Sequence, residues 1–380
     1  MAEQNQKPPL SFTAGGSVGY IPSVSAKSNA LFASKTNGSY FINVGYNTSP
    51  KNNVFAEAYN FPKMGFGFAM LDNNCLSYNN NSHLSNFYTI YGFFERPFVR
   101  TPKFKFGWML RHGVGFTRDL YDPFSNPTNY FGTHALLYIS VGLQMKWRIA
   151  PKWELGLDTY FFHHSNGKTS MPNSGMDELS VGAHVTYDLV EPYIGPRTRL
   201  KPRDFDKGFK WDIAFLCGVK AFEGEWMAKN EIVADPAQKA KNFTHIFRRG
   251  LTVDALYRYS LKCATGIGID FLYTPKTDYL RECDILYYGQ EEIDKYKYSP
   301  VALSIGAVHE MYYSNFALTV GLGGYLYRHV GPSETLSQFY QTVGFRYYFP
   351  SLANTFVGLH ARAAYFTRVD YLEFIIGIRI

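Results

Sequence analysis

Apolar and polar residues alternate along most of this chain with a period of two, which is the period of side chains in a β-strand. In 135–147 the odd positions are apolar, whereas the even positions include Gln144 and Lys146. The same alternation recurs in 211–221 and in 371–380. One face of these predicted strands is therefore almost wholly apolar, and the other mixes glycine with polar and charged residues.

Read from end to end, the alternation predicts about sixteen strands. They lie near 11–22, 38–48, 64–72, 85–99, 104–118, 134–149, 152–165, 177–189, 210–222, 245–260, 262–274, 300–313, 315–328, 338–349, 355–367 and 370–380. The segment 49–63 adds or replaces one strand, and residues 1–10 form a tail that does not resemble a signal peptide. Helix signals are scarce, and no apolar run reaches the roughly 18 residues that a transmembrane helix needs.

The predicted connections alternate between short and long. The short ones include 100–103, 150–152, 314–315 and 350–354, and the long ones are 73–84, 119–133, 166–176, 223–244 and 275–299. Short turns at one end and long loops at the other are typical of outer-membrane barrels. The connection 190–209 departs from this pattern, because it is long where a short turn is due.

We therefore expect an all-β fold, an antiparallel transmembrane β-barrel of about 14–16 strands that spans 11–380. A soluble sandwich would instead bury its apolar faces against each other. In a bilayer no sheet edge can stay open, so the barrel has to close. The alternative is an eight-stranded barrel over 11–190 followed by a second β unit over 191–380, because the long connection falls after eight strands.

Composition supports this picture and narrows the chemistry. Aromatic residues make up 18% of the 380 residues, which suits the aromatic girdles of a membrane barrel. The net charge is only +7, and the basic stretch 195–210 lacks interleaved stacking aromatics, so we expect no nucleic-acid partner. The four cysteines show no metal spacing, which leaves a disulfide between Cys75 and Cys283 open. We expect no metal and no cofactor.

One segment, HHSNGKTSMPNSGMD (163–177), carries candidate chemistry. Period-two geometry places His163 and Ser165 on the apolar face of one strand, and Asp177 on the apolar face of the returning strand. These two strands are joined by the loop 166–176 and should pair antiparallel, which brings the three side chains close together. Polar groups on a lipid-facing surface are costly, and they are therefore functional candidates.

The three residue types fit nucleophilic catalysis. A serine hydroxyl attacks an ester only when a histidine takes its proton, and a carboxylate orients that histidine. The Asn166 side chain and the backbone N–H groups of Gly167 and Lys168 are candidates for an oxyanion hole. A second serine motif, GGSVG (15–19), lies in a predicted strand rather than at the strand-to-helix turn that a hydrolase elbow needs.

The segment 163–177 resembles the active-site segment of outer-membrane lipid A 3-O-deacylases (PagL-like), which are small barrels with a lipid-facing His, Ser and Glu. The match is H-x-S-N followed by P-N-x-G-x-acid, within a deacylase-like half at 11–190. The resemblance implies His163 as base, Ser165 as nucleophile, Asp177 as the acid and Asn166 in the oxyanion hole. This chain has Asp where the family has Glu, and Glu178 is the substitute for the third role.

The resemblance implies an outer-membrane serine esterase that hydrolyses an acyl ester of lipid A in lipopolysaccharide, with Lys168 and other loop cations contacting phosphates. The HHSNGK run also resembles outer-membrane phospholipase A, so a phospholipase is an alternative. The additional strands in 191–380 motivate a third reading, a non-catalytic channel or a barrel subunit with protein partners in a membrane assembly. We expect Lys220, Arg346, Arg362 and Arg379 to point inward and pair with carboxylates such as Asp212 and Glu373.

Overall fold

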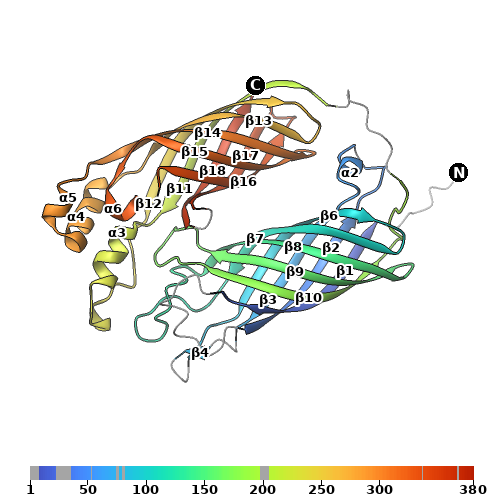
Figure 1. Ribbon diagram of the computed structural model, residues 1–380, viewed down its shortest axis with the longest axis horizontal. Coiled ribbons are helices and arrows are strands. Elements are labelled where there is room, and N and C mark those ends of the chain that lie inside the picture. Colours follow the sequence, from blue (N-terminus) through green and yellow to red (C-terminus); the bar gives the residue numbers. More distant parts are fainter. Residues whose placement is uncertain are drawn as a thin grey trace. The chain divides into compact units, whose positions relative to one another are not determined.

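The computed structural model describes residues 8–22, 36–52, 54–73, 77–78, 82–196, 205–335, 337–365 and 368–380. The chain divides into two compact units (Figure 1). The first comprises Met1–Asn166 and Ser174–Leu200, and the second comprises Gly167–Asn173 and Lys201–Ile380. Each unit contains one closed antiparallel barrel of eight strands among the described residues.

The first barrel has the strand order β1-β10-β9-β8-β7-β6-β3-β2. Its strands are β1 (Leu10–Tyr20), β2 (Thr36–Asn47), β3 (Lys63–Asp72), β6 (Phe87–Arg100), β7 (Phe104–Phe116), β8 (Ala135–Ala150), β9 (Trp153–Ser165) and β10 (Met176–Asp188). Neighbouring strands follow one another along the chain, with β3 paired directly to β6, and β10 pairs with β1 to close the ring, with Val18 opposite Val181. A separate small hairpin joins β4 (Ser77–Tyr78) to β5 (Ser82–His83).

The second barrel follows the chain order from β11 to β18. Its strands are β11 (Gly208–Lys220), β12 (Ile246–Arg258), β13 (Cys263–Tyr273), β14 (Tyr298–Tyr313), β15 (Phe316–Val330), β16 (Phe339–Phe349), β17 (Thr355–Ala364) and β18 (Arg368–Arg379). The ring closes where β18 pairs with β11, with Phe215 opposite Ile376.

Short helices occupy several connections. They are α2 (Val54–Ala58) in the first unit, and α3 (Glu223–Trp226), η1 (Met227–Glu231), η2 (Pro236–Gln238), α4 (Thr277–Tyr288), α5 (Gln290–Ile293) and α6 (Gly331–Glu334) in the second. The strand expected at 49–63 is therefore wrong, because this segment holds α2. No described helix has both the length and the apolar character needed to cross a membrane.

All sixteen expected strands correspond to strands of the two barrels, and the all-β antiparallel class is confirmed. The expectation of one large barrel is wrong, and the alternative of an eight-stranded barrel plus a second β unit is the observed one. The reason is the pairing of β10, which finds the edge of β1 instead of continuing to β11. Once eight strands close, no edge is left to accept a ninth.

The side chains of the barrel strands have the expected orientation, with apolar residues on the outside of the barrel and polar residues on the inside. In β9 exposed and buried positions alternate from Trp153 to Phe162, and exposed apolar side chains include Val18, Ile90 and Ile267. Asp158 of the first barrel is buried. A soluble sandwich would have buried the apolar face instead, so the pattern excludes it.

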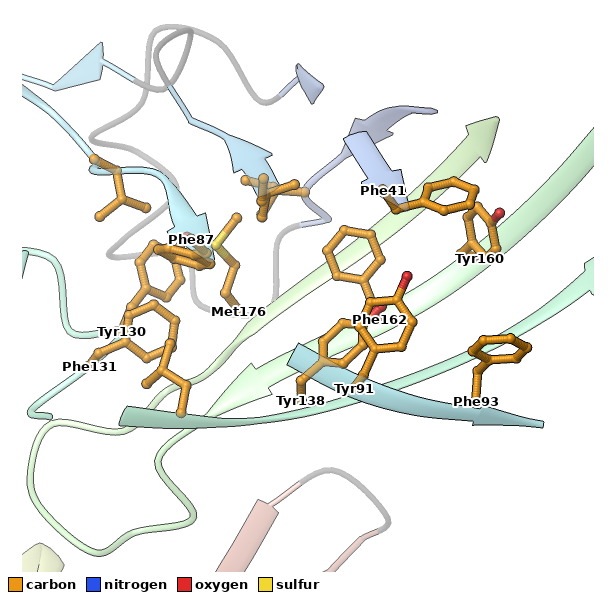
Figure 2. Close-up of a cluster of buried hydrophobic side chains, with 14 of the residues drawn as sticks. Phe41, Phe87, Tyr91, Phe93, Tyr130, Phe131, Tyr138, Tyr160, Phe162 and Met176 are labelled. Atoms are coloured by element: carbon orange, nitrogen blue, oxygen red, sulfur yellow. The ribbon is translucent and has the colours of Figure 1, made fainter. Parts of the chain in front are cut away.

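Aromatic side chains fill much of the first barrel's interior (Figure 2). The rings of Tyr91 and Tyr138 have centroids 5.6 Å apart, and that of Phe162 lies 6.1 Å from Tyr138. Arg111 lies among them, with its guanidinium carbon 4.6 Å from the centre of the Tyr160 ring. The interior is thus packed with side chains at this level.

Ion pairs fill the interior of the second barrel. Arg346 lies 2.9 Å from both Asp212 and Asp254, and 3.2 Å from Glu310. The expected inward pairing is confirmed for Arg379, which lies 2.7 Å from Asp212, and other pairs join Arg362 to Glu373 and Lys220 to Glu334. Buried charges are tolerated because each has partners.

Candidate active site

His163 and Asp177 meet on the outward side of the first barrel. They are directly opposite each other in the antiparallel pair β9–β10, so their side chains project to the same face. The Nδ1 atom of His163 lies 2.6 Å from Oδ1 of Asp177, which is hydrogen-bonding distance. Both side chains are partly exposed, at 21% and 17%. The carboxylate can therefore fix the tautomer and the ring orientation of the histidine.

Ser165 is the last residue of β9 and lies two positions after His163, on the same side of the strand. It is paired with Leu137 of β8. The expectation that Ser165 lies on an exposed surface is wrong, since only 3% of the residue is accessible. Alternation in β9 predicts the direction of its side chain, but it does not predict how deeply the residue is buried. A buried hydroxyl is shielded from bulk water.

The two residues adjacent to His163 and Asp177 turn inward. His164 is buried, and its Nε2 lies 3.1 Å from Oγ1 of Thr89. Glu178 is completely buried, and its Oε2 accepts a hydrogen bond of 2.6 Å from the Asn37 side chain. Glu178 therefore cannot substitute for Asp177, because strand alternation places it on the opposite side of the barrel wall.

Gly175 shapes the space around His163. It has a φ of 68°, and a β-carbon at this position would lie 2.7 Å from Cε1 of His163. Only glycine tolerates both the left-handed backbone and this close approach. The glycine in the P-N-x-G-x-D run thus has a direct structural reason, which the sequence spacing indicated but did not explain.

Loop 119–134 supports the same region. The backbone N–H of Ser174 donates to the carbonyl of Asn129 at 3.0 Å, and that of Gly175 donates to Tyr130 at 3.4 Å. Tyr130 is buried, and burial together with the nearby carboxylate of Asp177 raises the pKa of its phenol to about 12. Tyr130 is therefore neutral at physiological pH. Sequence reasoning gave no signal for this residue.

The expected oxyanion hole consists of the three residues after Ser165, namely Asn166, Gly167 and Lys168. Asn166 is buried in the first unit, whereas Gly167 and Lys168 belong to the second unit. Both Gly167 and Lys168 have left-handed backbones, with φ of 64° and 63°. The expectation that the Lys168 ammonium contacts phosphates is wrong, because it is buried between Glu223 and Glu334, at 3.3 and 3.4 Å. The backbone role of 166–168 stays a prediction.

A shallow apolar groove of about 420 Å³ lies on the outer face of the same strands. Thr159 lies at the middle of β9, with its cross-strand neighbours Leu143 and Val181 on either side. Phe161 separates this position from His163 along β9. The remaining lining residues are Trp108, Val141, Gly142, Tyr160, Leu179 and Ser180. The groove is therefore open to the exterior and mainly lined by hydrocarbon.

The other sequence candidates carry structural contacts. Ser17 of the GGSVG run lies in β1 and is hydrogen-bonded to Ser39 at 2.6 Å, so no hydrolase elbow forms there. Among the described residues, no group of three His, Cys, Asp or Glu side chains is arranged to hold a metal. Cys75 lies outside the residues that the structure describes, and with it the disulfide to Cys283.

Two family models match the chain. Residues 56–186 match "Lipid A 3-O-deacylase (PagL)", and residues 209–380 match "Acyloxyacyl hydrolase, C-terminal domain". The first match contains the His163–Asp177 pair and the groove, and the second contains the second barrel. No curated protein sequence matches the chain.

Solved structures give weaker likenesses. P. aeruginosa FpvA bound to a pyoverdine–iron complex is 10% identical over 99% of this chain and 63% of its own, with a TM-score of 0.26. A mutant Rh. blastica porin is 7% identical over 98% and 99%, with a TM-score of 0.17. The Ralstonia pickettii toluene transporter TbuX is 8% identical over 98% and 89%, with a TM-score of 0.18. The chain thus spans less than two thirds of FpvA, and such low scores do not indicate a shared overall fold.

Proposed function

The chain belongs to the lipid A 3-O-deacylase (PagL) family, and on that premise we propose that it is an outer-membrane serine esterase that hydrolyses an acyl ester of lipid A. The observation that carries this proposal is the hydrogen-bonded His163–Asp177 pair on the outward face, two residues from Ser165. An acyl substrate held in a lipid leaflet reaches that face directly. An active site inside the barrel would require the substrate to leave the membrane.

The outward apolar surface supports the membrane location. Each barrel closes on itself and presents apolar side chains outward, which satisfies the backbone and matches hydrocarbon. The groove beside Thr159 then provides a place for the acyl chain, along the same strands that carry His163 and Asp177. The carbonyl carbon would lie at the end of the groove near Ser165.

The proposed reaction proceeds through an acyl-enzyme. Ser165 Oγ attacks the ester carbonyl carbon while His163 Nε2 takes the hydroxyl proton, and Asp177 stabilises the resulting imidazolium. The tetrahedral oxyanion is stabilised by Asn166 and by backbone N–H groups of Gly167 and Lys168. Its collapse breaks the carbon–oxygen bond to the sugar, and His163 returns the proton to the leaving alcohol. Water, activated by His163, then releases the fatty acid and regenerates Ser165.

The test uses the full chain in outer-membrane-like liposomes that contain lipopolysaccharide. Mass spectrometry of lipid A should show loss of one acyl chain with the native protein, and no loss with Ser165→Ala or His163→Ala. A parallel assay with phosphatidylethanolamine liposomes separates a lipid A esterase from a phospholipase. If native protein and both variants leave the same acylation pattern, the proposal is wrong and a non-catalytic role is favoured.

A further inference from the structure

Two consecutive arginines of β12 face opposite sides of the second barrel's wall. Arg248 is buried inside, where its guanidinium lies 3.8 Å from the carboxylate of Asp370. Arg249 is exposed, on the same outward side of the strand as Phe247 and Leu251. The barrel thus supplies a carboxylate for the inward arginine and places the outward one among apolar side chains.

Arg249 interrupts an apolar surface formed by the outward positions of three neighbouring strands, β11, β12 and β13. The structure describes every residue of these strands, and Arg249 is the charged one among their outward positions. The other outward residues are Phe209, Trp211, Ile213, Phe215, Cys217, Val219, Phe247, Leu251, Val253, Ala255, Tyr257, Cys263, Thr265, Ile267, Ile269, Phe271 and Tyr273. Such a surface suits contact with hydrocarbon, so the charge on it needs an explanation.

Arg249 lies within this apolar band and not beyond its edge. Phe247, two residues nearer the end of the strand, is 53% exposed, and its cross-strand partner Val219 is 38% exposed. From Phe247 to Tyr257 the strand rises by roughly 33 Å, which a tilt of about 40° reduces to about 25 Å, the height of a barrel's apolar band. Arg249 then lies about 5 Å inside the edge, so its long side chain can reach the lipid headgroups.

The edge near Arg249 is the one with the long connections. The connections 221–245 and 274–297 are long and hold helices that include α3 and α4, at one end of the second barrel (Figure 1). The opposite end has short connections such as 259–262 and 314–315. Long loops of outer-membrane barrels face the outside of the cell, so in the membrane location proposed above Arg249 faces the outer leaflet.

Arg249 contacts an aromatic ring across the sheet. It is directly opposite Cys217 of β11 and Tyr273 of β13. Its guanidinium carbon lies 5.0 Å from the centre of the Tyr273 ring, which is a cation–π contact. Among the described residues no carboxylate pairs with Arg249, and none of its side-chain N–H groups has a hydrogen-bond acceptor. These donors lie in the plane of the guanidinium, which leaves them available to a ligand.

A phosphate group meets the requirements of this position. A charged side chain that faces hydrocarbon is costly unless an opposite charge or water reaches it. The planar guanidinium can bind two phosphate oxygens at once, and such charge-assisted hydrogen bonds are stronger than neutral ones. Lipid phosphates lie at the boundary of the hydrocarbon layer, which is also the level that tyrosine side chains favour.

We propose that Arg249 and Tyr273 form a binding site for a phosphate group of lipid A on the outer surface of the second barrel. The inference rests on the outer-membrane location in the proposed function and not on the esterase mechanism. Both residues lie in the second unit. The second barrel thus holds a lipid A molecule at its own wall, separate from any substrate that the first barrel binds.

The experiment measures lipid binding to the full chain in detergent by native mass spectrometry, which gives a dissociation constant for each bound lipid. Every protein carries Ser165→Ala, so that lipid A is not consumed. We expect Arg249→Gln to weaken the binding of one lipid A molecule by about tenfold or more, since a charge-assisted hydrogen bond is lost. Arg249→Lys keeps the charge but not the planar fork, and should recover part of the affinity.

Two further lipids identify the bound group. Lipid A without its phosphates should bind equally with Arg249 and with Arg249→Gln. Phosphatidylglycerol, whose phosphate is a diester with a single charge, should bind less tightly than lipid A and depend less on Arg249. If lipid A without phosphates shows the same loss, or if phosphatidylglycerol depends on Arg249 as strongly as lipid A does, the assignment to a lipid A phosphate is wrong.

The matched control is Arg281→Gln, which removes the same charge from α4, where Arg281 lies 2.8 Å from Asp294. It should bind lipid A as tightly as the protein with both arginines. An equal loss in the two variants overturns the proposal, because net charge then explains it, and so does unchanged affinity in Arg249→Gln. If Arg249→Gln does not fold, Tyr273→Leu removes the stacked ring and keeps an apolar side chain. It should also weaken lipid A binding, and unchanged affinity there has the same meaning.

The lipid site and the esterase proposal fail separately. Unchanged lipid A binding in Arg249→Gln leaves the esterase intact, because no residue of the candidate active site is altered. If Ser165→Ala keeps native deacylation, the esterase proposal fails, and an Arg249-dependent lipid A site still stands because binding is measured without turnover.

Discussion

Gly175 lies against the imidazole of His163 so closely that a β-carbon on the glycine would stand 2.7 Å from Cε1 and 3.3 Å from Nε2. The ring thus has backbone on one side and, at its Nδ1, the carboxylate of Asp177. Together the two contacts leave the imidazole little freedom to rotate.

Gly175→Ala should therefore impair catalysis without unfolding the barrel. The new methyl group has to displace His163, and a shift of about 1 Å at a catalytic group costs on the order of 10²-fold in rate. Steady-state kinetics with lipid A in liposomes measures the effect. Gly289→Ala is the matched control, because Gly289 also has a positive φ, of 88°, but nothing lies within 4 Å of its β-carbon position. Equal activity losses in both variants would contradict the steric explanation.

Asp177→Asn should lower kcat by about 10²–10⁴-fold, because an amide cannot stabilise the imidazolium or fix its tautomer. Asp177→Glu retains a carboxylate and should keep part of the activity. The first barrel offers a matched control in Asp158, which is hydrogen-bonded to Nδ1 of His184 in its interior. Asp158→Asn should reduce the free energy of unfolding by about 1.5–3 kcal/mol and leave kcat unchanged. If Asp158→Asn is inactive but keeps native stability, the assignment of Asp177 as the catalytic carboxylate is contradicted.

Filling the outer groove should affect long-chain substrates selectively. Thr159→Phe places a ring where we expect the acyl chain, so kcat/KM should fall about tenfold or more for lipid A. A short-chain ester should be hydrolysed at nearly the native rate. Ile90→Phe, at an exposed position of β6, controls for an added ring on the barrel exterior. Equal losses for both ester lengths would show that the groove does not hold the chain.

The ion pairs that Glu334 makes with Lys168 and Lys220 should give a defined pH dependence of stability. Burial alone would raise the pKa of Glu334, but Lys168 and Lys220 lower it below its ordinary value. A carboxyl whose folded pKa is lowered stabilises the fold above the unfolded pKa, about 4.3, and loses that contribution as pH falls through the folded pKa.

We therefore expect Glu334→Gln to be less stable than native protein at pH 7, by about 3–5 kcal/mol, and the difference to shrink as the pH falls below about 4. Urea unfolding in detergent micelles measures both values. Glu291→Gln, at an exposed site on α5, should change stability little at any pH. A Glu334→Gln difference that does not depend on pH would mean that packing, not charge, explains the effect.

Strand positions were predictable from the sequence because each barrel strand has its own period-two pattern. The closure of eight strands into each barrel was not predictable, because alternation indicates which face a residue occupies and says nothing about which edge a strand will join. The pairing of β10 with β1 links Val181 to Val18, across most of the first unit. The helix α2 was missed because its five residues are too few to show a helical period.

The same distinction applies to the candidate site. The approach of His163 to Asp177 followed from two strands joined by one loop, so local pattern was enough. The burial of Ser165 was missed because alternation gives the direction of a side chain and not its depth, and the partners of Lys168 were missed because they lie in distant parts of the chain. Glu334, for example, lies 166 positions after Lys168. Gly175 was identified as a motif residue from the sequence, but its close approach to the His163 ring is seen only in the structure.

Each barrel completes its own ring of backbone hydrogen bonds. The gain or loss of one barrel during evolution would therefore leave no unpaired strand edge on the remaining barrel. A shorter homologue that stopped after β10 would still be closed. Residue 168 of such a homologue would lie without Glu223 and Glu334, and a lysine there would be solvated by water and need no acidic partner.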